Sequence, residues 1–381
     1  MENPFVYGEV VPASAFVDRV DELRRLTADL GAGQKVFLIS PRRYGKSSLI
    51  RRALAALDRR GTLSVEVTVS SYSSYVAFLE GYARAVLTAA TRWERAMAWI
   101  RDVLSAARPQ LRIEPDASGA ANLAVSFPDV HGARDLSRVA AEVFALPARL
   151  GEARRRAVVV ALDEFQAVGA FNGGSVEESL RAAVQHQRRV GYVFAGSEPT
   201  LMEQMLTPKR PFYKAGPVMR LEKIPAEAFA RFIESRFAKS GFRVEAGFGL
   251  AIVELAGQLP YDVQRLAHEV WDDARSLGWR RVGLEHLHDT LKRLLAEQSI
   301  VFEAAWQRLT LGQRAVLRAV VLHDGRELLS SDVRGRHRLG GPSTVQAALA
   351  ALVRQDIVAR DGPRYVVIDS LMREWVVRRT F

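Results

Sequence analysis

The 381-residue chain contains no cysteine at all. Disulfides and cysteine-ligated metal sites are therefore excluded, and a reducing compartment is the simplest expectation. No window approaches the roughly 18 consecutive apolar residues that would span a bilayer. The first ten residues include acidic Glu2 and Glu9, which is not the pattern of a secretory signal. These absences predict a cytoplasmic protein without a membrane partner.

Lysine is scarce, since only seven of the 54 basic residues are lysines and the others are arginines. The net charge of +11 invites a nucleic-acid partner, but the arginines are dispersed and no sustained basic run occurs. The seven histidines show no paired metal-ligand spacing, so a zinc site is not expected. The composition is that of an ordinary globular protein, and the length suggests two or three domains.

Four runs of strand length that are rich in β-branched or aromatic residues lie in the first two hundred residues, at 35–40, 63–69, 157–164 and 191–197. Helical patterns lie between them, which predicts an α/β fold with a mostly parallel sheet covered by helices on both faces. Alternating residues on both sides of a glycine-containing turn at 110–127 indicate an inserted hairpin.

The pattern changes at Pro225, after which the segments are helical. The last eighty or so residues indicate three helices and then two short strands about an Asp-Gly-Pro turn, an order typical of a winged helix. We therefore predict three domains. They are an α/β core with its N-terminal segment at 1–222, an all-α lid at 223–298 and a winged-helix domain at 299–381.

A phosphate-binding pattern follows the first predicted strand, in "SPRRYGKSSLI" at residues 40–50. In the template G-x-x-x-x-G-K-[ST], successive backbone N–H groups at a helix N-terminus bind phosphate. Lys46 would reach the β- and γ-phosphates, and the Ser47 hydroxyl would take a Mg²⁺ position. Gly45 is present where a side chain would obstruct the phosphate. Ser40 stands at the first glycine position, where the strand needs only a tight exit.

A second acidic pattern ends the third predicted strand, in "VVVALDEF". Asp163 would hold Mg²⁺ through water, and Glu164 would orient or deprotonate an attacking water. Either motif alone has a plain alternative, which is a chance strand–turn–helix for the loop and a solvated acidic turn for the two carboxylates. The two together, in this order on these strands, favour a nucleotide site and a P-loop NTPase core.

Several segments in order along the chain resemble the archaeal-type ATPases, a family of AAA+/STAND-related P-loop ATPases with a C-terminal winged helix. The segments are "NPFVYGEVVPASAFVDRVDEL" (3–23), "SPRRYGKSSLI", "ALDEFQAV" (161–168), "LRAAVQHQRRVGYVFAGSEPTLMEQM" (180–205), "AGQLPYDVQRL" (256–266) and "YVVIDSLMREWV" (365–376). In that family the first segment passes near the adenine.

The resemblance implies ATP and Mg²⁺ as cofactors, and no guanine-reading N-K-x-D motif follows the fourth strand. The implied catalytic residues are Glu164, Lys46 and Ser197, the last as a sensor of the γ-phosphate, and the implied metal-binding residues are Ser47 and Asp163. The implied nucleotide-binding residues are Pro41, Arg42, Arg43, Tyr44, Gly45, Lys46, Ser47 and Ser48 in the loop, with Pro260 and Arg265 in the lid.

The chain departs from the family pattern at four positions. Ser40, Asp18 and Gln258 each replace a glycine, and Val20 replaces an acidic residue. These departures bear on adenine affinity and lid geometry more than on phosphate binding.

Several cationic side chains have two interpretations each. Arg42 and Arg43 would contact phosphate or a neighbouring subunit, or belong to a solvated basic loop. Arg210, Lys214 and Arg220 follow the fourth strand, where an arginine finger from one subunit to the next could lie. Ordinary surface charge is the simpler interpretation, and no finger is assigned.

The sequence allows two functions for the C-terminal module, which are DNA binding and contacts with protein. Its candidate recognition helix offers Ser343, Thr344 and Gln346 but few cations, and phosphate contacts dominate DNA affinity. Arg334, Arg336, His337, Arg338, Arg360 and Arg364 nearby could supply some.

Three functional hypotheses follow. The first is an ATP-hydrolysing switch whose nucleotide state, ATP or ADP, controls docking of the lid and winged helix and thereby partner binding, by a protein or by another copy of the chain. The second is a protein in which ATP gates binding of double-stranded DNA, as in origin-recognition ATPases. The third is a nucleotide-locked scaffold with little turnover.

Overall fold

The computed structural model describes residues 2–8, 12, 16–89, 109–115, 121–128, 130, 132–171 and 174–380. The chain forms two compact units. One is Arg19–Glu222, and the other joins the segment up to Asp18 with Lys223–Phe381. Within the described residues, no helix is both long and apolar enough to cross a membrane.

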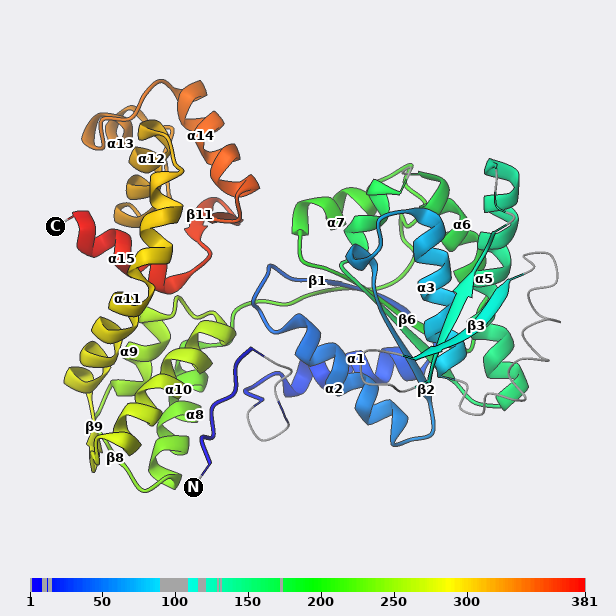
Figure 1. The fold of residues 1–381 in the computed structure, drawn as a ribbon, viewed down its shortest axis with the longest axis horizontal. Helices are drawn as coiled ribbons and strands as arrows, with labels where there is room; N and C mark the ends of the chain where they lie inside the picture. The colour runs from blue at the N-terminus through cyan, green and yellow to red at the C-terminus, as the bar shows by residue number, and fades with distance from the viewer. Residues whose placement is uncertain are drawn as a thin grey trace. The chain divides into compact units, whose positions relative to one another are not determined.

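A five-stranded parallel sheet forms the centre of the unit Arg19–Glu222 (Figure 1). The strands are β1 (Lys35–Ile39), β2 (Leu63–Thr68), β5 (Val158–Asp163), β6 (Val190–Gly196) and β7 (Val218–Arg220). Their order is β2-β5-β6-β1-β7, and every neighbouring pair is parallel. The four predicted strands are confirmed, and all five strands end at the same edge of the sheet.

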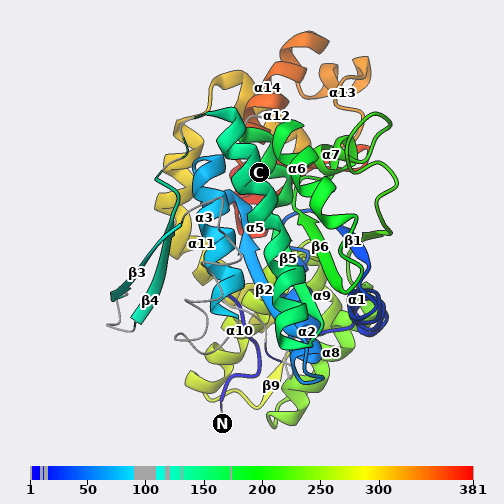
Figure 2. The same cartoon turned by 90° about the vertical axis from the view of Figure 1, so that its right-hand side faces the viewer.

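Helices cover both faces of this sheet, as predicted (Figure 2). Helices α1 (Val20–Gly31) and α2 (Lys46–Asp58) lie on one face, and α3 (Tyr75–Thr88) and α5 (Ala133–Arg154) lie on the other. Helix α6 (Gly174–Val184) packs against α5, and the short α7 (Pro199–Met205) follows β6. Strands β5 and β6 are buried along their whole length, as a parallel sheet covered twice requires.

The predicted hairpin is present as β3 (Gln110–Pro115) and β4 (Ala121–Ser126), which pair antiparallel. Its turn, residues 116–120, lies outside the described residues. The hairpin packs on α3 and does not extend the central sheet. The buried side chains of Leu123 and Val125 anchor it, and the backbone N–H of Phe127 donates to Glu80 of α3 at 3.0 Å.

The helical region after Pro225 is confirmed in the second unit. Its helices are α8 (Ala226–Lys239), α9 (Phe248–Leu255), α10 (Pro260–Ser276) and α11 (Leu284–Gln307). Two short strands, β8 (Arg243–Val244) and β9 (Arg281–Val282), pair in parallel between these helices. The sequence did not indicate them, because two residues are too few for a recognisable alternation.

The winged helix follows the helical region directly in the chain. Its elements are α12 (Leu311–Leu322), α13 (Ser331–Arg336), α14 (Pro342–Arg354), β10 (Val358–Asp361), β11 (Arg364–Val367) and a final α15 (Ser370–Thr380). Helix α11 continues from the lid into this module as one element and contacts α15. The lid and the winged helix share one apolar core.

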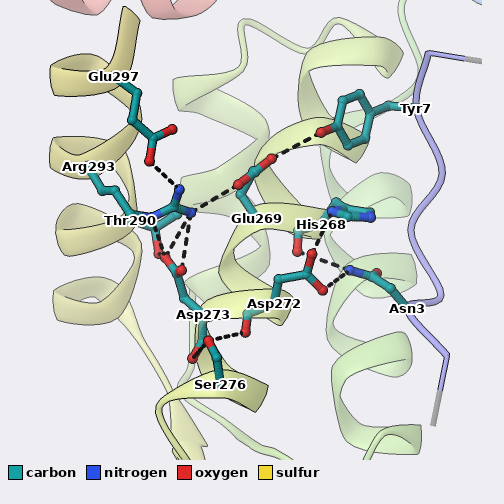
Figure 3. A network of polar contacts seen from close by, with 10 residues as sticks. All are labelled: Asn3, Tyr7, His268, Glu269, Asp272, Asp273, Ser276, Thr290, Arg293 and Glu297. Carbon is teal, nitrogen blue, oxygen red and sulfur yellow. Dashed lines mark hydrogen bonds and ion pairs between the residues drawn. The ribbon is translucent and has the colours of Figure 1, made fainter.

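The N-terminal segment lies against α10 (Figure 3). The Asn3 amide donates to the carbonyl of His268 at 3.1 Å and to Asp272 at 2.8 Å, and the Tyr7 hydroxyl donates to Glu269 at 3.0 Å. The described part of this segment therefore belongs to the unit that contains the lid, whereas the sequence grouped it with the α/β core. Residues 9–11 and 13–15 of the segment lie outside the described residues.

Arg293 of α11 bonds to α10 in the same network (Figure 3). Its guanidinium reaches Glu269 at 3.0 Å and Asp273 at 3.1 Å on α10, and Glu297 at 2.8 Å on its own helix. Thr290 of α11 donates to Asp273 at 2.7 Å. The two helices are thus held together by charge-assisted hydrogen bonds as well as by apolar contacts.

Gln258 has the backbone conformation that favours glycine, with φ 61°. It follows Gly257, and both residues end α9 through the N–H bonds Gly257 to Glu254 (3.0 Å) and Gln258 to Val253 (2.9 Å). Left-handed backbone costs a residue with a Cβ about 1–2 kcal/mol, while glycine adds about 0.5–1 kcal/mol of unfolded-state entropy. We expect Gln258→Gly to stabilise the protein by about 0.5–1 kcal/mol.

The measurement is the urea midpoint followed by tryptophan fluorescence. Gln355→Gly is the matched control, because Gln355 ends α14 with φ −88° and gains nothing from glycine. The control should lower the midpoint. An equal fall in both variants would show that the left-handed conformation of Gln258 carries no cost.

Candidate functional site

Ser40 leads from β1 into the loop that precedes α2. It is fully buried, its N–H donates to the carbonyl of Gly196 at 3.2 Å, and its hydroxyl donates to the carbonyl of Pro41 at 3.0 Å. Its backbone is not left-handed, unlike that of twelve other non-glycine residues among those described. A serine therefore fits this exit from the strand without strain, and its side chain satisfies its own polar atom.

The loop turns through two left-handed residues, Arg43 with φ 68° and Gly45 with φ 86°. A Cβ added to Gly45 would meet no atom of the described residues within 4 Å. Open space therefore adjoins the N-terminus of α2, which begins at Lys46, and a helix N-terminus favours an anion. Glycine is required here by the backbone conformation, and its missing side chain leaves the approach to the helix clear.

Lys46 is buried, with 6% of its side chain exposed, and it faces two carboxylates. Its ammonium contacts Asp163 Oδ1 directly and lies 3.2 Å from Glu164 Oε1. The Ser47 hydroxyl donates to the other oxygen of Asp163 at 2.9 Å. The loop lysine and serine thus meet the acidic end of β5, as the sequence predicted from two segments more than a hundred residues apart.

Glu164 lies at the centre of a polar cluster and has a left-handed backbone, with φ 54°. Its Oε2 accepts hydrogen bonds from the Ser197 hydroxyl at 2.5 Å and from the Gln166 amide at 2.6 Å. Residues held in uncommon backbone conformations cluster at functional sites. Three groups from three segments therefore hold the carboxylate that the sequence singled out as catalytic.

Burial would raise the pKa of the Glu164 carboxyl, but its polar contacts oppose this effect. The Lys46 ammonium and the hydrogen bonds from Ser197, Gln166 and Lys46 outweigh burial, so the pKa lies below its ordinary value. Glu164 is therefore ionised at neutral pH and can act as an acceptor for a proton or a water molecule.

The strand order explains why these residues meet. Strand β6 lies between β1 and β5, so the residue after β6 lies between the ends of the other two strands. That residue is Ser197, which follows Gly196. Because parallel strands present their carboxyl ends at one edge, the sheet itself brings together Lys46 of the loop, the acidic pair and Ser197.

Gln166 is a site residue to which the sequence assigned no role. It lies in the short 3₁₀ helix η3 (Phe165–Ala170), two residues after Glu164. Its Oε1 is buried and accepts no hydrogen bond from the described residues. A Cβ on Gly196 would come within 2.7 Å of that oxygen and 2.3 Å of Met202. The signal available was the adjacency of Gln166 to the acidic pair, but its orientation depends on the packing against Gly196.

Among the other predicted residues of the loop, Tyr44 is buried, Arg42 is exposed, and Pro41, Arg43 and Ser48 are partly exposed. Pro260 begins α10 and Arg265 lies further along it, so both belong to the unit that contains the lid. Their predicted part in nucleotide binding remains a prediction.

The three cations considered for an arginine finger have partners in their own unit. Arg210 pairs with Glu177, a carboxylate with no exposed surface, whereas Arg220 lies 2.9 Å from the exposed Glu203. The Lys214 ammonium lies 5.3 Å from the ring centre of Tyr213. These contacts account for each side chain within one copy of the chain.

The donor set suits a nucleotide with Mg²⁺. A serine hydroxyl and an aspartate supply hard oxygen ligands, which Mg²⁺ prefers alongside phosphate oxygens. The open space beside Gly45 and the N-terminus of α2 suit a phosphate. The buried Lys46 is paired with carboxylates in this structure, and phosphate oxygens would replace them as its partners. These residues would hold the phosphates and the ion, and the ion would supply charge neutralisation.

Comparison with known proteins supports this description. Residues 300–378 match the family model of a probable winged helix domain. No curated protein sequence matches the chain. The Walker-type ATPase PABY2304 of Pyrococcus abyssi has a similar structure, with a TM-score of 0.62 at 17% identity, covering 97% of this chain and 99% of that one. The Orc1 protein of Aeropyrum pernix, solved with DNA, has a TM-score of 0.53 at 16% identity, covering 98% and 97%.

Identities this low establish the fold and nothing finer. The parallel sheet, the loop and acidic strand, the helical region and the winged helix occur in one chain in the predicted order. The resemblance in the sequence is confirmed at that level, and the chain has the fold of the Walker-type P-loop ATPases with a C-terminal winged helix.

Proposed function

We propose that this protein is an ATP-binding and ATP-hydrolysing molecular switch of the AAA+/STAND type. One observation carries the proposal, which is the meeting of Lys46, Ser47, Asp163, Glu164 and Ser197 at one edge of the sheet. Each would have a role in phosphoryl transfer. Lys46 would bind phosphate, Ser47 and Asp163 would bind the metal ion, Glu164 would orient water, and Ser197 would sense the γ-phosphate.

Nucleotide binding would rearrange the existing contacts in a definite order. Lys46 would bind the phosphates in place of Asp163 and Glu164, and Ser47 and Asp163 would hold Mg²⁺, which would neutralise phosphate charge. Glu164, no longer paired with the ammonium, would be free to orient the attacking water, while Ser197 and Gln166 would keep its carboxylate in place.

The lid and winged helix respond together in this proposal. They share one compact unit and one apolar core, with α11 common to both. Nucleotide state would therefore change how this whole unit docks on the α/β core, and through it which protein or second copy of the chain can bind.

Calorimetry on the pure, folded protein with ATP, with and without Mg²⁺, tests this proposal. We expect saturable heat that is strengthened by Mg²⁺ in the parent and that loses its Mg²⁺ dependence in Ser47→Ala. Hydrolysis assayed alongside separates a switch from a nucleotide-locked scaffold, because the scaffold would bind ATP without turnover. No heat with ATP and Mg²⁺ would remove the proposal.

A second candidate is ATP-gated binding of double-stranded DNA through the winged helix. The observation in its favour is the exposed N-terminal face of α14, where Ser343, Thr344 and Gln346 are exposed as a recognition helix requires. The similar Orc1 structure is of a complex with DNA. Against it, Arg336 pairs with Asp332, and Arg364 pairs with Asp324 and Asp361.

Carboxylate pairing of these arginines predicts weak DNA affinity. With few cations left for phosphates, we expect a shallow dependence of the binding constant on salt, with a slope of about −2 to −3 in log K against log[salt]. A fluorescence-anisotropy titration of duplex DNA at several salt concentrations measures the slope. Asp332→Asn with Asp324→Asn should steepen it if Arg336 and Arg364 lie on the DNA-binding face, and an unchanged slope would place them elsewhere.

A further inference from the structure

Arg19 is the first residue of the α/β unit and one of its few buried charges, with 6% of it exposed. Its guanidinium donates to at least three groups among the described residues. Nη1 reaches the Glu22 carboxylate at 2.9 Å, while Nη2 reaches the carbonyl of Tyr44 at 3.3 Å and the carbonyl of Glu222 at 2.5 Å. Two of these partners are backbone groups far apart in the sequence, and each has a special position.

Glu222 is the last residue of the α/β unit, so Arg19 bonds across the two points where the chain leaves that unit. The exit at Glu222 is also attached to the sheet, because the N–H of Leu221 donates to the carbonyl of Ile39 at 2.9 Å. Ile39 ends β1 directly before the phosphate loop. Both exits are thus bound to the strand and loop that would hold the nucleotide.

Tyr44 lies inside the phosphate loop, immediately before Gly45. The carbonyl of Tyr44 and the N–H of Gly45 belong to one peptide group, which is planar and trans, so they point in opposite directions. A positive charge on the carbonyl polarises the peptide and makes its N–H a stronger donor. Arg19 therefore supports, from behind the loop, an N–H group that the phosphate would use.

The backbone around Arg19 is strained. Asp18 has φ 32°, and Arg19 has φ 127° with ψ 20°, a conformation that residues with a Cβ rarely adopt. Such strain persists only where the surroundings impose it. Here the carbonyl of Arg19 also accepts the N–H of Leu23 in the first turn of α1, so the helix and the guanidinium fix the residue from both sides.

We propose that Arg19 is a positioning residue that links the phosphate loop to both chain exits of the α/β unit. The inference rests on the proposed function, because its signal is phosphate at the loop. When phosphate draws on the Gly45 N–H, the bond from Arg19 to the Tyr44 carbonyl strengthens, and the hold of Arg19 on Glu222 changes with it. Occupancy of the site is thereby passed to the two segments that join the units.

The test compares the full-length parent with Arg19→Lys, which keeps the charge but replaces the planar fork of five donors by one compact ammonium. Glu22→Gln is a milder variant that weakens the orientation of the guanidinium and keeps both carbonyl contacts. Arg24→Gln is the control, because Arg24 is an exposed arginine on the same helix, paired only with exposed Asp21 among the contacts described. Nucleotide affinity comes from calorimetry, and hydrogen exchange of residues 41–48 and 218–226 is followed with and without a non-hydrolysable ATP analogue and Mg²⁺.

In the parent and in Arg24→Gln, the analogue should slow exchange at 41–48 and change it at 218–226. Arg19→Lys should bind the analogue about ten-fold more weakly, since a charge-assisted contact behind the loop is lost. At saturating analogue it should keep the response at 41–48 and lose the response at 218–226. Glu22→Gln should lie between the two. A merely structural role of Arg19 would lower the melting temperature without separating the two responses.

Three results would overturn the inference. A parent that binds the analogue but shows no change at 218–226 would remove it and leave the proposed function intact. An Arg19→Lys variant with the parent's affinity and both responses would do the same. A parent that does not bind nucleotide removes the proposed function and the inference with it. If Arg19→Lys does not fold, an unchanged response at 218–226 in Glu22→Gln decides against the link.

Discussion

Replacing Lys46 with alanine is expected to weaken ATP binding about 100-fold. The lysine is the buried cation of the phosphate loop, and a hydrogen bond between charged groups is worth about 1.5–3 kcal/mol. The loss should persist at saturating Mg²⁺, because the ion would neutralise different phosphate oxygens. Calorimetric titration with ATP and Mg²⁺ measures it.

The control is Lys209→Ala, which removes an exposed lysine from the same unit. It should bind ATP as the parent does. Parent-like affinity in the Lys46 variant would mean that the contacts of Lys46 with Asp163 and Glu164 are purely structural and that the nucleotide, if bound, lies elsewhere.

The same substitution should change how stability depends on pH. In the parent, the pKa of Glu164 is lower in the folded protein than the ordinary carboxyl value, so the ionised carboxylate stabilises the fold at pH values above that ordinary value. This contribution to stability is lost as the pH falls through the lowered pKa. Without Lys46, the largest of the contacts that lower that pKa is lost, so the pKa rises relative to the parent's and the contribution shrinks. The melting temperature of the variant should therefore fall furthest below the parent's near pH 7.5, and the difference should narrow near about pH 4. A constant difference would contradict the coupling.

Replacing Glu164 with glutamine should reduce ATP turnover by about 10²–10³-fold while nucleotide affinity stays within a few-fold of the parent. Glutamine has the same shape and retains an oxygen for Ser197, but it carries no charge and cannot accept a proton. A phosphate-release assay on pure protein measures the rate at saturating ATP.

Glu198→Gln is the matched control, since Glu198 is exposed and only one residue beyond Ser197. Its turnover should equal the parent's. Equal turnover in Glu164→Gln would assign the water-orienting role to another group. Absence of turnover in the parent, together with tight ATP binding, would favour the nucleotide-locked scaffold.

The sequence predicted the parts of this molecule that depend on local pattern. Strands β1, β5 and β6 are continuous apolar runs because both of their faces are buried, whereas β2 alternates between buried and more exposed residues. The loop and the acidic pair directly follow β1 and β5. Their meeting was also predictable, because parallel strands end at one edge of the sheet. The sequence also predicted that Ser40 could replace the first glycine of the loop pattern, because this position needs a small residue and not a left-handed backbone.

The elements that were missed depend on distant partners. Strand β7 has three residues and exists through its pairing with β1, and β8 and β9 have two residues each. The role of Gln166 depends on its contact with Glu164 and on the room that Gly196 leaves for its side chain. None of these pairings leaves a periodic trace in the sequence around it.

Two departures from the family pattern have a physical meaning that only the backbone reveals. Asp18 and Gln258 replace glycines, and both have left-handed conformations. Glycine adopts such a φ without strain, and this chain keeps the conformation with residues that strain it. At Asp18 the strain adjoins Arg19, whose buried guanidinium holds the turn in place.

Helix α11 has a mechanical consequence for any movement that starts at the nucleotide. Its 24 residues measure about 36 Å, and the winged-helix match begins at residue 300, inside the helix, with no joint between the modules. A tilt of about 10° at its lid end would sweep its far end through about 6 Å. A small rotation at the lid end of the helix would therefore produce a displacement of several ångströms at its winged-helix end.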